Sequence, residues 1–181
     1  MAKALVCGFE GFEEVECLTI VDVLRRGGVD VTLALPTPEV RAGRGVRVHG
    51  DALLKDVKDK VYDLVALPGG PGWKNLQADT TIREIVEAHV KAGKYIGAIC
   101  AAPAVCLGEW GLIKGRHATC YPSLKDRLKD SSYTDKEPFV IDGQFITSRG
   151  PATAMRFAVE LLMLLMGREA ADKVASDLLL Q

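Results

Sequence analysis

The 181-residue chain carries 23 Lys plus Arg against 24 Asp plus Glu, a formal net charge of −1, and 48% of its residues are hydrophobic. This ordinary globular composition predicts one domain over residues 1–181 and disfavours nucleic-acid binding, which needs a basic footprint. The longest apolar run, 161–166, is too short to cross a bilayer, and no signal-peptide pattern opens the chain. We therefore expect a cytoplasmic protein with no nucleic-acid or membrane partner.

Strands and helices alternate along the chain. The first helix, predicted over 13–26, has acids in its first turn, arginines in its last and two glycines as its stop. An irregular or hairpin segment runs from Pro36 through 46–48, and a second hairpin over 138–148 is expected to turn at Asp142-Gly143. The expected buried strands cover 3–9, 29–35, 62–67 and 95–99, and the remaining helices cover 80–92, 101–107, 152–166 and 168–180.

This alternation predicts an α/β fold with a doubly wound, mainly parallel sheet and helices on both faces. In such sheets, ligands bind outside the carboxyl ends of the strands. Phe9, Gly69-Gly70 and Cys100 all follow predicted strands. We expect these three segments to converge on one crevice.

Cys100 stands where a buried strand turns directly into a helix, and only small residues surround it: Gly97, Ala98, Ala101 and Ala102. This pattern indicates a nucleophile elbow, a strained turn in which bulky neighbours would clash. The N-terminus of the following helix is expected to lower the pKa of the thiol and make it reactive at neutral pH. A lone cysteine in an apolar run is usually a core residue, but the small neighbours favour a nucleophile.

The other four cysteines form no CxxC pair and no zinc-like spacing with Cys100. An odd count of five suits free thiols in a reducing compartment, so we expect no disulfide and no metal. Cys7 and Cys106 lie in apolar segments and are interpreted as core residues. Cys17 and Cys120 lie beside motifs of the candidate site and are expected to be accessible thiols.

Five segments together carry a family resemblance. They resemble the ThiJ/PfpI superfamily in order and spacing, and within it the branch of the Parkinsonism-associated deglycase. The likeness covers essentially the whole chain, and five linked motifs are far more specific than any one of them. The segments are Glu13-Glu14-Val15-Glu16, Leu67-Pro68-Gly69-Gly70, Ala98-Ile99-Cys100-Ala101-Ala102-Pro103, 121–126 and Thr147-Ser148-Arg149-Gly150-Pro151.

The resemblance implies a flavodoxin-like fold, a homodimer and a nucleophilic, oxidation-sensitive cysteine at Cys100. It also implies the activities of this branch, which are conversion of methylglyoxal to lactate without glutathione, repair of glycated side chains and redox-linked protective or chaperone roles. No GxGxxG motif or phosphate loop is present, so no cofactor is expected.

The resemblance matches Glu16 to a carboxyl group that hydrogen-bonds the nucleophilic sulfur. A carboxyl beside an anion should have a raised pKa, and could donate to the sulfur and then shuttle a proton. The backbone N–H groups of Gly70 and Ala101 would form an oxyanion hole. Glu13 and Glu14 are interpreted as solvated acids of a helix N-terminus.

The chain departs from the family pattern at Tyr121, where many relatives have histidine, and at Ala101, where other superfamily members have one. The three histidines, His49, His89 and His117, are interpreted as surface residues. Without a Cys-His pair a cysteine protease lacks its activator, so proteolysis is disfavoured. Tyr121, with an ordinary pKa near ~10, would rarely ionise, which leaves Glu16 as the proton carrier.

Arg26 and Arg44 are exposed charges in the ordinary interpretation. In the family, arginines at matching positions lie near the site and the dimer contact, so they are candidate contacts for a small anionic group. Tyr121 is a third candidate contact.

The sequence therefore supports two candidate functions. The first is a cofactor-independent enzyme that acts on 2-oxoaldehydes or glycated side chains through a hemithioacetal on Cys100. The second is an oxidative-stress sensor or redox-regulated chaperone in which Cys100 is oxidised to sulfinate, and the same activated thiol serves both.

Overall fold

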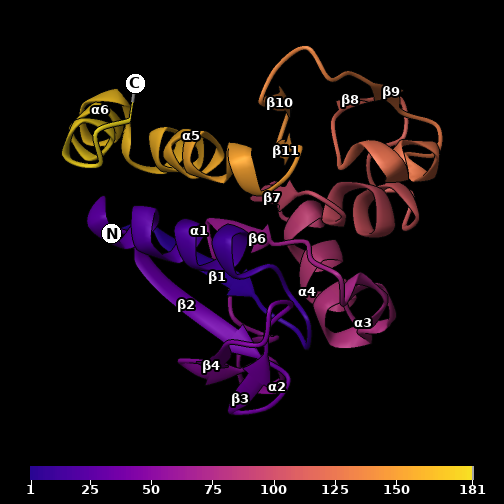
Figure 1. Ribbon diagram of the computed structural model, residues 1–181, viewed down its shortest axis with the longest axis horizontal. Coiled ribbons are helices and arrows are strands. Elements are labelled where there is room, and N and C mark those ends of the chain that lie inside the picture. Colours follow the sequence, from indigo (N-terminus) through magenta and orange to yellow (C-terminus); the bar gives the residue numbers. More distant parts are fainter. Residues whose placement is uncertain (181) are drawn as a thin grey trace.

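The computed structural model describes residues 1–180 and contains a seven-stranded, mainly parallel sheet (Figure 1). The sheet strands are β1 (Lys3–Cys7), β2 (Asp30–Leu35), β5 (Ala52–Leu53), β6 (Leu64–Leu67), β7 (Tyr95–Ile99), β10 (Phe139–Asp142) and β11 (Phe145–Ser148). They lie in the order β10-β11-β7-β6-β1-β2-β5, and only β10 runs antiparallel to its neighbour. The expected α/β sheet is confirmed.

Helices cover both faces of this sheet (Figure 1). The long helices are α1 (Glu14–Arg26), α4 (Thr80–Lys91), α5 (Ala154–Met166) and α6 (Arg168–Asp177). Helix α1 packs against α5, which packs in turn against α6, while α4 contacts β7 and the short helix α2 (Leu54–Val57). The central strands β1 and β6 are therefore almost wholly buried, which explains their continuous apolar sequences.

Helix α1 ends where the two glycines predict. The N–H of Gly27 donates to the Val23 carbonyl at 3.1 Å, and Gly28 takes a φ of 82°. A Cβ at Gly27 would lie 2.2 Å from Cδ1 of Leu162, so the glycine also permits the close contact with α5. This contact fixes the helix that carries the acids of the candidate site.

The segment after β7 differs from the expected α-helix over 101–107. It is a π-helix, η1 (Pro103–Gly108), and the N–H of Glu109 donates to the carbonyl of Ala104 five residues back. A Cβ at Gly108 would lie 2.5 Å from the Arg127 carbonyl oxygen. The widened helix thus packs closely against η2 (Pro122–Arg127), a 3₁₀-helix that the sequence analysis did not predict.

The C-terminal hairpin turns one residue later than expected. Asp142 pairs with Phe145, so the turn residues are Gly143 and Gln144 rather than Asp142-Gly143. Asp142 instead accepts hydrogen bonds from the N–H of His117 and from Arg116. The hairpin expected after Pro36 is confirmed, and the remaining short elements are β3 (Glu39–Arg41), β4 (Arg47–His49), α3 (Trp73–Ala78), β8 (His117–Ala118), β9 (Ser132–Tyr133) and η3 (Pro151–Thr153).

Candidate active site

Cys100 directly follows β7 and has a φ of 64°, in the left-handed region that a non-glycine residue occupies only when its surroundings hold it there. Its N–H donates to the Ser148 carbonyl at 3.0 Å, and its own carbonyl accepts from the N–H of Tyr121 at 2.7 Å. The strained turn expected at this cysteine is therefore present.

Two glycines after β6 bring a second loop against the cysteine. A Cβ at Gly69 would lie 2.7 Å from the Cβ of Cys100 and 2.8 Å from the Ala101 nitrogen. Gly70 has a φ of 137°, and a Cβ there would lie 2.4 Å from the Glu13 nitrogen. Only glycine fits at either position, so the loop can touch both the cysteine turn and the start of α1.

Glu16 lies in the first turn of α1 and is fully buried. The N–H of Gly69 donates to its Oε2 at 2.8 Å. Its Oε1 makes no hydrogen bond of regular geometry within the described part of the chain, but the carboxyl interacts with the Cys100 thiol, and the interaction contributes to the pKa of both groups. Burial raises the pKa of Glu16 to about 7, against the lowering effects of Gly69 and Cys100.

The thiol itself is not in the electrostatic state that the sequence analysis expects. Burial raises the pKa of Cys100 above its ordinary value, the charged Glu16 carboxylate raises it further, and the N–H of Ala101 lowers it. The prediction of a lowered thiol pKa is therefore wrong. Protonation of Glu16 removes the repulsion between the two groups, but burial still raises the pKa of the thiol.

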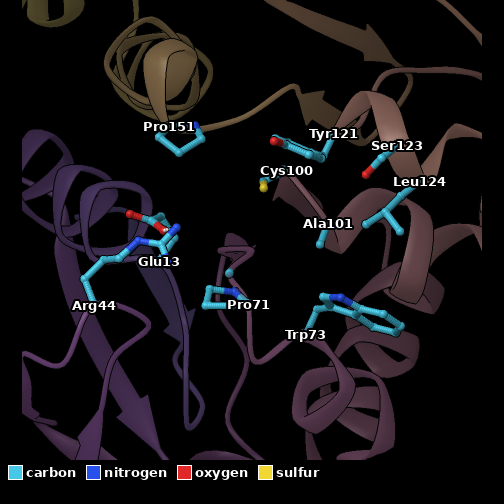
Figure 2. Close-up of a pocket in the computed structure, with 11 residues that line it drawn as sticks. Glu13, Arg44, Pro71, Trp73, Cys100, Ala101, Tyr121, Ser123, Leu124 and Pro151 are labelled. Atoms are coloured by element: carbon cyan, nitrogen blue, oxygen red, sulfur yellow. Dashed lines mark ion pairs between the residues drawn. The ribbon is translucent and has the colours of Figure 1, made fainter.

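A cavity of about 330 Å³ opens over Cys100. Figure 2 shows the sulfur near its centre, with Glu13, Arg44 and Pro71 on one side and Ala101, Leu124 and Trp73 on the other. The complete lining is Glu13, Arg44, Gly70, Pro71, Trp73, Cys100, Ala101, Tyr121, Ser123, Leu124 and Pro151. Gly70 and Ala101, the two oxyanion-hole candidates, thus lie at the same cavity as the sulfur.

Glu13, and not Glu16, is the carboxylate that lines this cavity. Glu13 is 8% exposed and forms an ion pair with Arg44 at 3.8 Å (Figure 2). Glu14, 9% exposed, accepts the backbone N–H of Arg44 at 2.7 Å. The interpretation of Glu13 and Glu14 as solvated acids is wrong, because the loop after β3 folds over the start of α1 and buries both.

The structure does not bring Arg26 to the cavity. Arg26 lies in the last turn of α1, at the opposite end of the helix from Glu13, and pairs with Asp22 at 2.8 Å. The hydrogen bond and the charge of Asp22 raise the pKa of Arg26. Phe9 also stays away from the cavity, since it is buried and packs edge-on against Phe12.

Tyr121 does reach the cavity, and its side chain is among the exposed groups of the wall. Figure 2 shows it directly above Cys100. Positions 121 and 101, where the resemblance implies histidine in relatives, thus hold a tyrosine and an alanine, and no histidine of the described chain lines the cavity. The lining within residues 1–180 therefore lacks the base that a histidine-activated protease needs.

One histidine is not where the sequence analysis places it. His89 is buried on α4, where its Nδ1 lies 2.7 Å from the Ile85 carbonyl and its Nε2 accepts the N–H of Tyr62 at 3.0 Å. Its surface assignment is therefore wrong, because the apolar face of α4 packs on the sheet. His49 and His117 are exposed as expected.

All five cysteines are free and buried, and only Cys100 has any exposure, 9% against 0% for the others. The core assignments of Cys7 and Cys106 are confirmed. The expectation that Cys17 and Cys120 are accessible is wrong, since α1 turns Cys17 inward and the segment after β8 encloses Cys120.

Besides misassigning Glu13, sequence reasoning missed five residues of the lining. Pro71 directly follows Gly70. Trp73 follows the double glycine by three positions, and Ser123 and Leu124 follow Tyr121 by two and three. Pro151 closes the last family motif. Each lies within three residues of a position singled out from the sequence or inside a quoted motif, so proximity to the motifs was the available signal.

Within residues 1–180, no group of three or more His, Cys, Asp or Glu side chains is placed to hold a metal ion. In the same range, every helix is too short or too polar to cross a membrane.

Comparison with curated proteins gives matches over nearly the whole of this chain. The chain is 40% identical over 182 residues to Protein DJ-1 homolog B of Arabidopsis thaliana and 39% identical over 173 residues to Glutathione-independent glyoxalase DJR-1.2 of Caenorhabditis elegans. The matches cover 99% and 94% of this chain. They cover 42% of the plant protein, 45% of its paralogue homolog A and 92% of the nematode protein, so the chain spans less than half of the plant relatives.

The fold closely matches those of solved structures. DJ-1beta of Drosophila melanogaster superposes with a TM-score of 0.95 at 38% identity, covering 99% of this chain and 98% of that one. Oxidized DJ-1 of Toxoplasma gondii gives 0.93 at 34% identity, covering 99% and 98%. The sequence profile of the DJ-1/PfpI family matches residues 2–164. The chain therefore belongs to the DJ-1/PfpI family.

Proposed function

We propose that this protein is a cofactor-independent glyoxalase that converts 2-oxoaldehydes such as methylglyoxal to 2-hydroxy acids. The observation that carries the proposal is the strained Cys100 at a cavity, in contact with a buried Glu16 whose pKa is raised to about 7. The glyoxalase name of the nematode relative supports it. A group with a pKa near the working pH can both accept and return a proton.

The first step forms a carbon–sulfur bond. The Cys100 proton passes to Glu16, the thiolate adds to the aldehyde carbon as the carbonyl π bond opens onto oxygen, and Glu16 returns the proton to that oxygen to give a hemithioacetal. The developing oxyanion is stabilised by the N–H groups of Gly70 and Ala101, which lie at the cavity beside the sulfur.

The second step moves hydrogen within the substrate. Glu16 removes the proton from the former aldehyde carbon and delivers it to the neighbouring carbonyl oxygen, which gives an enediol. Transfer of the hydroxyl proton of the sulfur-bearing carbon to the neighbouring carbon then yields a thioester of the 2-hydroxy acid. Water then hydrolyses the thioester and restores the Cys100 thiol, so one water is consumed and no external oxidant or reductant is needed.

A glycated side chain can follow the same path, because its sugar-derived carbonyl group also adds to a thiolate. The cavity is open on one side, with Arg44 and Tyr121 largely exposed at its wall. We therefore extend the proposal to glycated protein side chains as a second substrate class of the same site.

The direct test is lactate formation from methylglyoxal by the purified protein, without glutathione or added cofactor. Lactate should accumulate in proportion to enzyme concentration, as measured with a coupled lactate assay. A rate no higher than that of buffer alone, from folded protein with a reduced Cys100, would refute the glyoxalase proposal.

Tyr121→His is expected to change the pH dependence of turnover. The substitution places a group with an ordinary pKa of ~6.5 directly over Cys100, so the rate profile should gain a limb near that pH. Steady-state rates at acidic, neutral and alkaline pH check this, with Tyr121→Phe as the control that removes the hydroxyl and adds no base. Identical profiles for the two variants would show that position 121 takes no part in proton transfer.

A second candidate is an oxidative-stress sensor that uses the same thiol. The observation that favours it is the difference in exposure between the cysteines, since only Cys100 lines the cavity and the other four are fully buried. In addition, a protonated Glu16 can donate a hydrogen bond to an added sulfinate oxygen. Redox-regulated chaperone activity would be an output of that oxidised state.

Mild peroxide is therefore expected to oxidise Cys100 before any other cysteine, first to sulfenic and then to sulfinic acid. Mass spectrometry of the digested protein measures the site of the added oxygens. Glu16→Leu should weaken the preference, because it removes the donor to the oxidised sulfur. Oxygens found mainly on Cys17 or Cys120 would contradict the sensor proposal.

The homodimer implied by the resemblance stays a proposal. It is supported by two apolar side chains that α1 leaves exposed, Val15 and Leu18, which lie three residues apart on one side of the helix.

A further inference from the structure

We propose that Trp73 makes this site selective for 2-oxoaldehydes that carry an aromatic or other bulky apolar group. The inference rests on the proposed function and names the substrate class of the same cavity. Its basis is the division of the cavity into a polar side, at Glu13 and Arg44, and an apolar side, at Trp73 and Leu124 (Figure 2).

Trp73 forms the apolar side from the first residue of α3. Its backbone N–H donates to the Gly70 carbonyl at 3.1 Å, so it starts directly from the loop that approaches Cys100. The indole is partly buried, packs on the core and lines the cavity. In Figure 2 the ring lies below Ala101 and Leu124, on the side of the sulfur away from Arg44.

Two cations lie close to the indole ring. The Arg127 guanidinium lies 4.9 Å and the Lys74 Nζ 5.8 Å from the ring centroid, and Arg127 pairs with Glu109 at 3.7 Å. A cation over an aromatic face is attractive and restricts the ring. Arg127 is thus a positioning residue that presents the indole to the cavity, and it does not itself line the cavity.

The cavity is larger than small oxoaldehydes need. Its volume of about 330 Å³ corresponds to roughly ten water molecules at about 30 Å³ each. Glyoxal and methylglyoxal fill a small part of that space, and would leave the indole in contact with water. A phenyl ring attached to the reacting carbonyl groups would occupy more of that space and pack on Trp73, where aromatic pairs are favourable beyond their buried area.

The groups next to the sulfur favour the reacting end. The backbone donors of Gly70 and Ala101, together with Arg44 on the side away from Trp73, offer hydrogen bonds to the two substrate oxygens, while Trp73 and Leu124 offer an apolar surface to the rest of the substrate. A substrate with oxygens at one end and an apolar ring at the other therefore matches the cavity in one orientation. Phenylglyoxal, which yields mandelate, is the simplest such compound.

The test compares initial rates on glyoxal, methylglyoxal and phenylglyoxal for the unmodified protein, Trp73→Phe and Trp73→Ala. We expect kcat/KM to be highest for phenylglyoxal in the unmodified protein. Trp73→Ala should lower it for phenylglyoxal about tenfold, through KM, and for glyoxal less than about twofold. Trp73→Phe should retain most of the preference.

The chain contains a matched control in its other tryptophan. Trp110 also lies near an arginine, with Arg83 5.9 Å from its ring centroid, but it does not line the cavity. Trp110→Phe should leave all three substrates unchanged. Arg127→Gln should raise KM for phenylglyoxal and leave kcat and the glyoxal KM unchanged, a split that general destabilisation would not produce.

A binding measurement separates this inference from the glyoxalase proposal. In the Trp110→Phe protein Trp73 is the only tryptophan, so its fluorescence reports on the cavity. Mandelate should change that fluorescence saturably, and lactate at the same concentration should not. An inactive protein that still shows this difference would refute the glyoxalase but support the aromatic subsite. Equal responses to both acids, or equal losses on all three aldehydes in Trp73→Ala, would overturn the inference.

Discussion

Cys100→Ala is expected to reduce lactate formation from methylglyoxal to the rate of buffer alone. The thiolate is the only nucleophile in the proposed mechanism, so its loss removes the covalent path. The fold should persist, since alanine keeps the Cβ already accommodated at this φ of 64° and the backbone bonds to Ser148 and Tyr121 do not involve sulfur. Lactate assays and circular dichroism measure the two properties.

The matched control is Cys106→Ala, which removes the same atom from the same segment. Cys106 is fully buried in η1, so the change should cost on the order of 1 kcal/mol of stability and leave turnover nearly normal. Thermal melts beside the activity assay distinguish the two variants. Lactate production that survives in Cys100→Ala would eliminate the thiol mechanism.

Glu16→Gln is expected to have opposite effects on activity and stability. Activity should fall by about 10²-fold or more, because an amide cannot carry a proton between sulfur and substrate. Stability above neutral pH should rise, because a buried carboxylate is replaced by a neutral group that still accepts from the Gly69 N–H. A Glu16→Gln protein with full activity would leave the mechanism without its proton carrier.

The pH range of the stability effect follows from the raised pKa. The pKa of Glu16 is about 7 in the folded chain, against an ordinary value of 4.5, so the folded state holds the proton more tightly. Well below pH 4.5 Glu16 is protonated in both the folded and the unfolded chain, so it does not lower the free energy of unfolding. The free energy of unfolding falls as the pH rises from about 4.5 to 7, by an amount on the order of 3 kcal/mol, and the contribution of Glu16 then stays constant.

The unmodified protein should therefore lose more stability than Glu16→Gln between pH 4.5 and 7. Chemical denaturation at both ends of this range and at its middle measures the difference. Glu84→Gln, which removes an exposed carboxylate on α4, is the control and should follow the unmodified protein. Parallel stability curves for Glu16→Gln and the unmodified protein would show that Glu16 is not destabilising when charged.

Features that depend on local sequence could be predicted. The alternation of apolar strands with helices indicated the parallel sheet, and the small residues around Cys100 indicated the strained turn. The glycines after β6 and α1 also had their expected positions. In each case the residue types within a few positions determine the backbone, so a single sequence window contains the information.

Features that depend on contacts between distant segments could not be predicted from the sequence. Glu13 and Glu14 have the sequence signature of a solvated helix N-terminus, but a loop some thirty residues later covers them. His89 lies on the packed face of α4, and its partner Tyr62 precedes it by 27 residues. The thiol pKa depends on burial and on Glu16 more than on the following helix. Trp73 forms the apolar side of the cavity together with Leu124 of η2, which lies 51 residues later in the chain.

The first turn of α1 holds three acids with three different neighbours. Glu13 lines the cavity, Glu14 binds the backbone of the loop at Arg44, and Glu16 contacts the thiol. Successive residues of an α-helix are rotated by about 100°. Any rotation of α1 about its own axis would therefore move all three carboxyls at once, so the cavity wall, the loop and the proton carrier are mechanically linked through one rigid helix.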